Sequence, residues 1–210
     1  MKIKGVHPTI IACAVLAVVI GLSIVVSVIV PLSAPQNAKS QYFCDVAVFS
    51  FDLDINVENM SGEALYNIDG EFFNKYEDNL EMKDAEGNIV MEMRDDFNFI
   101  TQNDHAIKRD NDVLCAMEGQ FKMFGDTYNI FDANKEQVAT LKCNMFMTSC
   151  ELLDMQGNVM AEYDSRILRS DYVVSIFDGC KIDDETVLML FASAYSDARS
   201  DNSTSSSNKN

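Results

Sequence analysis

Apolar and polar residues alternate with a period of two along most of the chain after residue 48. The clearest stretch, 49–57, reads "FSFDLDINV" and places an apolar side chain at every second position. This alternation is typical of a β-strand with one buried face and one solvated face. The pattern predicts strands at 49–57, 65–72, 80–83, 89–93, 97–101, 105–108, 113–117, 127–131, 138–143, 150–153, 159–163 and 172–177. Short strands at this spacing favour an antiparallel barrel or sandwich.

A weak internal repeat supports a hairpin architecture. "LEMKDAEGNIVMEM" begins at Leu80, "CELLDMQGNVMAEY" at Cys150, and the looser "YNIFDANKEQVATL" at Tyr128. In each copy an aspartate is expected to cap a turn with its side chain, and a glycine to accept a positive φ; Lys135 replaces that glycine in the third copy. The uneven spacing of the copies favours separate hairpins over a solenoid.

The pattern changes to that of a helix at 183–197, "DDETVLMLFASAYSD". Asp183 or Asp184 is a suitable N-cap, and Glu185 suits the positive end of a helix. The unbroken apolar run 187–192 leaves no polar stripe, so the helix must be buried on every side or lie in a membrane. At about fifteen residues it is too short to span a bilayer. We therefore predict a closed barrel of about twelve strands with this helix through its lumen. A helix packed across a sandwich is the alternative.

The N-terminal region predicts a membrane anchor. The run Ile10–Val30 contains no charged residue and matches the ~20 apolar residues that cross a bilayer. Pro35 follows Ala34 and argues against cleavage there, although a cleaved signal peptide remains the alternative. Lysines before the run place the N-terminus in the cytoplasm and the barrel outside. The predicted layout is a cytoplasmic N-terminus (1–9), a transmembrane anchor (10–30), a linker (31–48), the barrel domain (49–201) and a disordered polar tail (202–210).

The net charge and the cysteine content limit which partners and which kind of metal site are expected. The net charge of −17 disfavours nucleic acid and anionic lipid as partners. The six cysteines contain no C-x-x-C pair, which argues against a zinc site. Buried free thiols are the expected state, and one disulfide is left open for an oxidising compartment.

No catalytic, cofactor-binding or metal-binding residues are predicted. The two histidines are His7, ahead of the apolar run, and His105, which lies in the polar stretch "QNDHAIKRDND" and is expected to be an exposed turn residue. The acidic pairs are expected to be solvated, with loose surface calcium binding as a minor alternative; they are Asp52/Asp54, Asp95/Asp96 and Asp110/Asp112.

The stretch from Phe51 to Asp201 resembles the tubby C-terminal-like superfamily and, within it, the LURP-one-related proteins. The resemblance is carried by the ordered segments "LYNIDGEFF", "LEMKDAEGNIVMEM", "DTYNIFDANKEQVATL", "CELLDMQGNVMAEYD", "DYVVSIFDG" and "DDETVLMLFASAYSD". It implies a twelve-stranded barrel around the last segment as a helix. The tubby branch implies phosphoinositide binding, but its phosphate-binding residues cannot be matched here. The nearest basic clusters are Lys108-Arg109 and Arg166/Arg169.

These observations predict a non-enzymatic, single-pass, membrane-anchored barrel module that binds a protein or lipid partner. A phospholipid-binding or scramblase-like lipid protein is the alternative. A hydrolase that uses a thiol or carboxylates is a third hypothesis, and a catalytic thiol would require a lowered pKa.

Overall fold

The computed structural model describes residues 35, 37–47, 53–70, 79–95, 104–120, 125–165 and 171–207. All of them belong to one compact unit, Ala34–Asn210. The predicted anchor at 10–30 and the predicted strand at 97–101 lie outside these residues. Within the described part of the chain, no helix is both long and apolar enough to cross a membrane.

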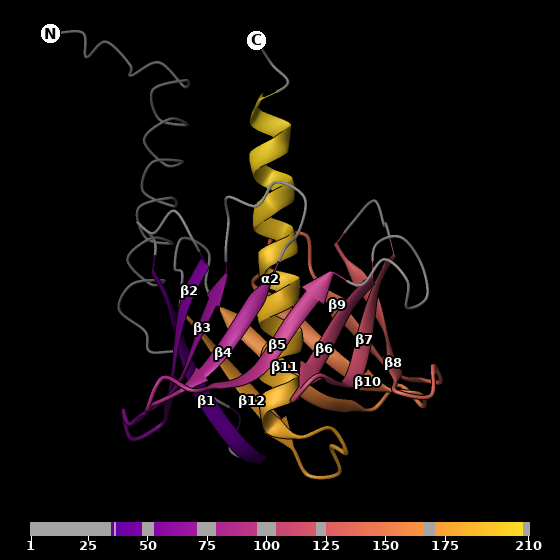
Figure 1. Cartoon of the computed structure of the whole chain (residues 1–210). Coiled ribbons are helices and arrows are strands. Elements are labelled where there is room, and N and C mark those ends of the chain that lie inside the picture. The colour runs from indigo at the N-terminus through magenta and orange to yellow at the C-terminus, as the bar shows by residue number, and fades with distance from the viewer. Residues whose placement is uncertain are drawn as a thin grey trace, which may run out of the picture. The chain divides into compact units, whose positions relative to one another are not determined.

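Twelve β-strands close into an antiparallel barrel (Figure 1). Each strand pairs with its neighbours in the sequence, and β1 closes the barrel against β12. The strands are β1 (Ala38–Val46), β2 (Leu53–Asn59), β3 (Ala64–Gly70), β4 (Leu80–Asp84), β5 (Ile89–Asp95), β6 (Asp104–Arg109), β7 (Asp112–Gln120), β8 (Thr127–Asp132), β9 (Gln137–Cys143), β10 (Ser149–Asp154), β11 (Val159–Ser165) and β12 (Tyr172–Phe177). The closed barrel is confirmed, and the sandwich alternative is wrong.

The period-two pattern sets the inner face of the barrel. In β2, Leu53, Ile55 and Val57 are buried, whereas Asp54 and Asn56 face outward. The strand that the sequence prediction missed is β1, which lies inside the range predicted as a linker. Its first half, "AKSQ", is polar and hides the alternation. Without β1, β2 and β12 would each have an unpaired edge.

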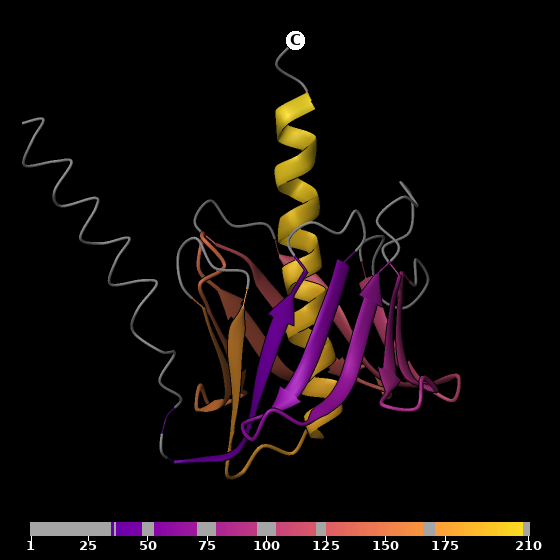
Figure 2. The ribbon, with the colours of Figure 1, turned by 90° about the vertical axis from the view of Figure 1, so that its left-hand side faces the viewer.

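The helix α2 (Asp184–Ser207) runs through the lumen and leaves the barrel at one end (Figures 1 and 2). All side chains from Val187 to Ala194 are buried, so the helix forms the centre of the core. This confirms the helix-filled barrel. The helix continues to Ser207, beyond the predicted end near Asp197 and into the stretch predicted as a disordered tail.

The two ends of the barrel are different. Because neighbouring strands are antiparallel, their connections alternate between the ends. The hairpin end carries the β2–β3, β4–β5, β6–β7, β8–β9 and β10–β11 turns and the start of α2 (Figure 1). The exit end carries the β9–β10 connection, and α2 emerges there (Figure 2).

The repeated hairpins form as the sequence predicts. In the β10–β11 turn, Asp154 Oδ1 accepts hydrogen bonds from the backbone N–H groups of Gln156 (2.9 Å) and Asn158 (2.8 Å). Asp84 and Asp132 make the equivalent pairs of bonds in their turns. The three left-handed turn residues are Gly87 (φ 85°), Gly157 (φ 86°) and Lys135 (φ 65°).

Candidate functional site

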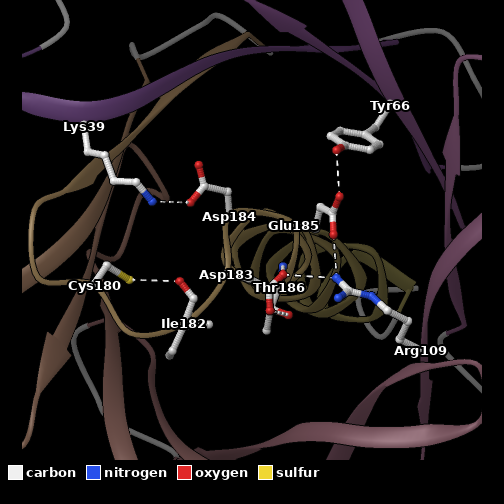
Figure 3. A network of polar contacts seen from close by, with 9 residues as sticks. All are labelled: Lys39, Tyr66, Arg109, Cys180, Ile182, Asp183, Asp184, Glu185 and Thr186. Carbon is white, nitrogen blue, oxygen red and sulfur yellow. Dashed lines mark hydrogen bonds and ion pairs between the residues drawn. The ribbon is translucent and has the colours of Figure 1, made fainter.

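Carboxylates gather at the first turn of α2, on the hairpin end of the barrel (Figure 3). Asp183 is the N-cap: its Oδ1 accepts the Thr186 N–H (3.1 Å), and its Oδ2 accepts the Thr186 hydroxyl (2.8 Å). These bonds satisfy a helix-terminal N–H that would otherwise have no partner. The prediction of an N-cap at Asp183 or Asp184 is therefore confirmed at Asp183.

The next two residues connect the helix to the barrel wall. Asp184 Oδ2 accepts the hydroxyl of Tyr42 on β1 at 2.7 Å, and its Oδ1 lies 3.4 Å from Lys39 Nζ. Glu185 Oε1 accepts the hydroxyl of Tyr66 on β3 at 2.7 Å (Figure 3). These contacts anchor the start of α2 to two separate strands.

Arg109 on β6 adds a third attachment. Its guanidinium donates to Glu185 Oε2 and, at 3.1 Å, to Asp183 Oδ1. We call the seven residues of this arrangement the helix-start cluster; they are Lys39, Tyr42, Tyr66, Arg109, Asp183, Asp184 and Glu185. Its carboxylates are paired with cations and hydroxyl donors, so the cluster is a closed network rather than a reactive centre.

The pKa shifts agree with this structural role. Burial and the hydrogen bond to Glu185 raise the pKa of Tyr66 to about 12, so its hydroxyl stays a donor. The pKa of Asp184 lies below its ordinary value. Burial acts to raise this pKa, but the hydrogen bonds from Ser40 and Tyr42 act in the opposite direction and outweigh the effect of burial. The carboxylate of Asp184 therefore remains an acceptor at neutral pH.

The cysteines fall into two groups. Cys143 and Cys150 form a disulfide between β9 and β10, where they are directly opposite in register. Cys44 and Cys115 are buried free thiols, and burial raises the pKa of each to about 12. Burial also raises the pKa of the half-buried Cys180. A raised pKa disfavours the thiolate, so these three thiols are poor nucleophiles.

His105 does not lie where the sequence predicted. It is a half-buried residue of β6, and its Nε2 lies 3.1 Å from Asp197 Oδ1 on α2. The prediction of an exposed turn residue is wrong. His105, Ile107 and Arg109 occupy alternate positions of β6 and so share one face of the strand. The polar side chains of His105 and Arg109 on this face both bond to the helix. Sequence reasoning also missed the inward role of Arg109. The only signal was that alternation.

The acidic and basic clusters singled out in the sequence do not assemble into a ligand site. Among the described residues, no group of three or more His, Cys, Asp or Glu side chains is placed to hold a metal ion. Asp54 accepts the amide of Asn67 at 2.8 Å. Lys108 is opposite Glu92 in register, whereas Arg109 belongs to the helix-start cluster. Asp52, Asp96, Arg166 and Arg169 lie outside the described residues.

The outer wall of β2–β5 carries a row of acidic residues in register. Asp54, Asp69, Glu81 and Glu92 are successive cross-strand partners. Like charges directly opposite each other are unfavourable. Two cations offset this cost: Lys83 pairs with Asp69 at 2.8 Å, and Arg94 bridges Glu81 (3.2 Å) and Glu92 (2.9 Å).

The architecture defines the class of the protein: a closed antiparallel barrel whose lumen is filled by its own C-terminal helix, as in the tubby-like fold. The model of the LURP-one-related family matches residues 41–192. The chain therefore belongs to the LURP-one-related family, as its sequence motifs indicate.

A solved structure supports the fold. The X-ray structure of a protein from Arabidopsis thaliana is similar to this chain with a TM-score of 0.54 and 12% sequence identity. The similarity covers 79% of this chain and 97% of the Arabidopsis chain. No curated protein sequence matches the chain. At this identity the likeness concerns the fold alone.

Proposed function

We propose that this protein is a non-enzymatic, membrane-anchored barrel module that binds a protein or lipid partner on the outside of the barrel. The observation that carries the proposal is the filled lumen. Val187–Ala194 of α2 is buried among the inward side chains of the strands. In the described residues, no buried side-chain nitrogen or oxygen lacks a hydrogen-bond partner. Such a core offers no polar group to a small-molecule substrate, so recognition belongs to the rims and the outer wall.

The proposed anchor is the run Ile10–Val30, whose length and lack of charge suit a bilayer. The disulfide Cys143–Cys150 supports a barrel on the extracytoplasmic side, because disulfides persist in oxidising compartments and are rare in the cytosol. The lysines that precede the run support the same orientation.

The anchor is tested by alkaline carbonate extraction of membranes from cells that express the full chain. We expect the protein to stay in the membrane pellet, because a transmembrane helix resists extraction. The double variant Val18→Arg/Val19→Arg is expected to move to the supernatant, since charges at the centre of a span are costly. The matched control is Gln36→Arg/Asn37→Arg, which adds the same charges beyond the apolar run. Extraction of the unmodified chain would contradict the proposal.

The absence of catalysis is tested on the purified chain with ester and phosphoester substrates. We expect no turnover, because the three free thiols in the described structure have raised pKa values. Turnover that alkylation of the free cysteines abolishes would support the hydrolase hypothesis instead.

A further inference from the structure

The β2–β3 turn has the same capped geometry as the turns of the three repeated hairpins. Asn59 Oδ1 accepts the backbone N–H groups of Ser61 at 2.9 Å and Glu63 at 3.1 Å. In the repeated hairpins an aspartate oxygen accepts the N–H groups two and four residues ahead in the same way. Gly62, at φ 80°, takes the left-handed position of the turn. Asn59 therefore stands where the other three turns have an aspartate.

The side-chain amide of Asn59 adds a nitrogen that the turn geometry does not require. The turn is closed through Oδ1, and a carboxylate supplies the same acceptor in the other hairpins. Asn59 Nδ2 donates to Glu63 Oε2 at 2.8 Å, and this bond uses one of the two N–H groups of the amide. Replacing the other N–H hydrogen with a substituent leaves all three side-chain bonds of Asn59 intact.

The surroundings of this amide are open. Residues 60–64 are all exposed, and the Met60 side chain is 54% exposed. A Cβ added at Gly62 would meet no atom of the described residues within 4 Å. The turn lies at the hairpin end of the barrel, where Asn59 is opposite Tyr42 of β1 in register. A bulky group attached to the turn would therefore extend into solvent.

The residues of the turn match a modification pattern. Residues 59–61 read "NMS", which is the Asn-X-Ser/Thr acceptor of N-linked glycans, with X other than proline. The sequence contains one other match, "NST" at 202–204, which falls near the C-terminal end of α2. The aspartates of the repeated hairpins have no side-chain nitrogen, so their turns cannot serve as acceptors.

We propose that Asn59 is an N-glycosylation site. The co-substrate is a polyisoprenyl diphosphate-linked oligosaccharide of a secretory compartment. The bond between sugar C1 and the diphosphate oxygen breaks, a bond from C1 to Asn59 Nδ2 forms, Nδ2 releases one proton, and the polyisoprenyl diphosphate leaves. The inference rests on the extracytoplasmic barrel of the proposed function. It adds that a solubilising glycan covers the β2–β3 side of the hairpin end and keeps partners away from it.

The test uses the full chain expressed in eukaryotic cells, with Asn202→Gln so that the other acceptor sequence is removed. We expect peptide-N-glycosidase to lower the apparent mass and to leave aspartate at position 59, detected by mass spectrometry. Asn59→Gln and Ser61→Ala should each abolish the mass change. Ser61→Ala keeps the backbone N–H that bonds to Asn59, so the turn is preserved. Ser61→Thr is the matched control and should keep the glycan.

A reporter variant separates this inference from the proposed function. Glu136→Thr, combined with Asn59→Gln and Asn202→Gln, creates an acceptor sequence at Asn134 in the exposed β8–β9 turn. Modification of Asn134 in this variant, with Asn59 unmodified in the chain that retains it, would overturn the inference and leave the barrel extracytoplasmic. No modification at either position would overturn the extracytoplasmic barrel as well. A mass change that persists in Asn59→Gln would also overturn the inference.

Discussion

At the scale of single residues, the aspartates of the repeated turns link the sequence pattern to pH. Asp154 illustrates the arrangement: a hydrogen bond from the Asn158 side chain, followed by backbone N–H bonds, lowers its pKa below the ordinary value. The pKa of Asp84 is lowered in the same way, and that of Asp132 chiefly by the backbone N–H of Glu136. The hydrogen bonds of each turn therefore favour the ionised form of its aspartate.

We predict that the turn aspartates contribute to acid sensitivity. Because their pKa values are lower in the folded state, their contribution to stability is present above the ordinary carboxyl pKa and is lost as the pH falls below it. Asp154→Asn keeps an oxygen acceptor but cannot ionise. Urea unfolding measured from neutral to acid pH should show a flatter pH dependence for this variant than for the unmodified chain. An unchanged slope would contradict the assignment.

Lys135 supplies a second residue-scale prediction. It has φ 65° at the turn position where Gly87 and Gly157 occur in the other hairpins. A non-glycine residue at a positive φ costs about 1–2 kcal/mol of stability. Replacing it with glycine removes this cost, but the extra freedom of glycine in the unfolded chain offsets part of the stability gained. Lys135→Gly should raise the free energy of unfolding by about 0.5–1 kcal/mol, and the reciprocal Gly87→Ala should lower it by about 1 kcal/mol. Chemical denaturation checks both, and a loss of stability in Lys135→Gly would contradict the account.

At the scale of elements, α2 is the part of the fold that the sequence specified most clearly. A helix with no polar stripe has to be buried on all sides, and the lumen of the barrel provides that burial. The helix is bonded to β6 near both ends of its buried part, by Arg109 at the start and by His105 to Asp197. The helix is thus an integral part of the barrel core.

We predict that Leu190→Asp unfolds the barrel or destabilises it by several kcal/mol, since Leu190 is fully buried and a carboxylate there would have no partner. The control is Val159→Asp, the same charge at an exposed position (40% exposed), which should change stability little. Circular dichroism during thermal unfolding measures both. Equal melting temperatures for the two variants would show that α2 is not in the core.

The alternation of β2 and the turn residues made most strands and hairpins predictable, but two features needed three-dimensional register. The polar start of β1 concealed a strand that pairs with both β2 and β12. The roles of Arg109 and His105 could not be predicted from the strand pattern alone, because both side chains bond to α2, whose position depends on the folded barrel. The disulfide could have been inferred from the sequence, because the predicted strand 138–143 ends at Cys143 and the predicted strand 150–153 begins at Cys150.

At the scale of the whole molecule, the two ends of the barrel have different chemistry. The hairpin end consists of aspartate-capped turns and the helix-start cluster, whereas the exit end carries the exposed apolar side chains of Met145 and Phe146 in the β9–β10 connection. The outer wall between them carries the row of carboxylates bridged by Lys83 and Arg94. The lumen is occupied by α2. This distribution leaves the rims and the outer wall as the surfaces at which the proposed recognition would take place.

The central claim, a single-pass anchor with the barrel outside, is tested most directly by protease protection. The full chain carries one epitope tag at each terminus and is expressed in intact cells, and protease is added from outside. The account predicts that the C-terminal tag is lost while the N-terminal tag is protected until the membrane is opened, because the lysines before the apolar run keep the N-terminus in the cytoplasm. Protection of both tags, or loss of both, would contradict the anchored orientation.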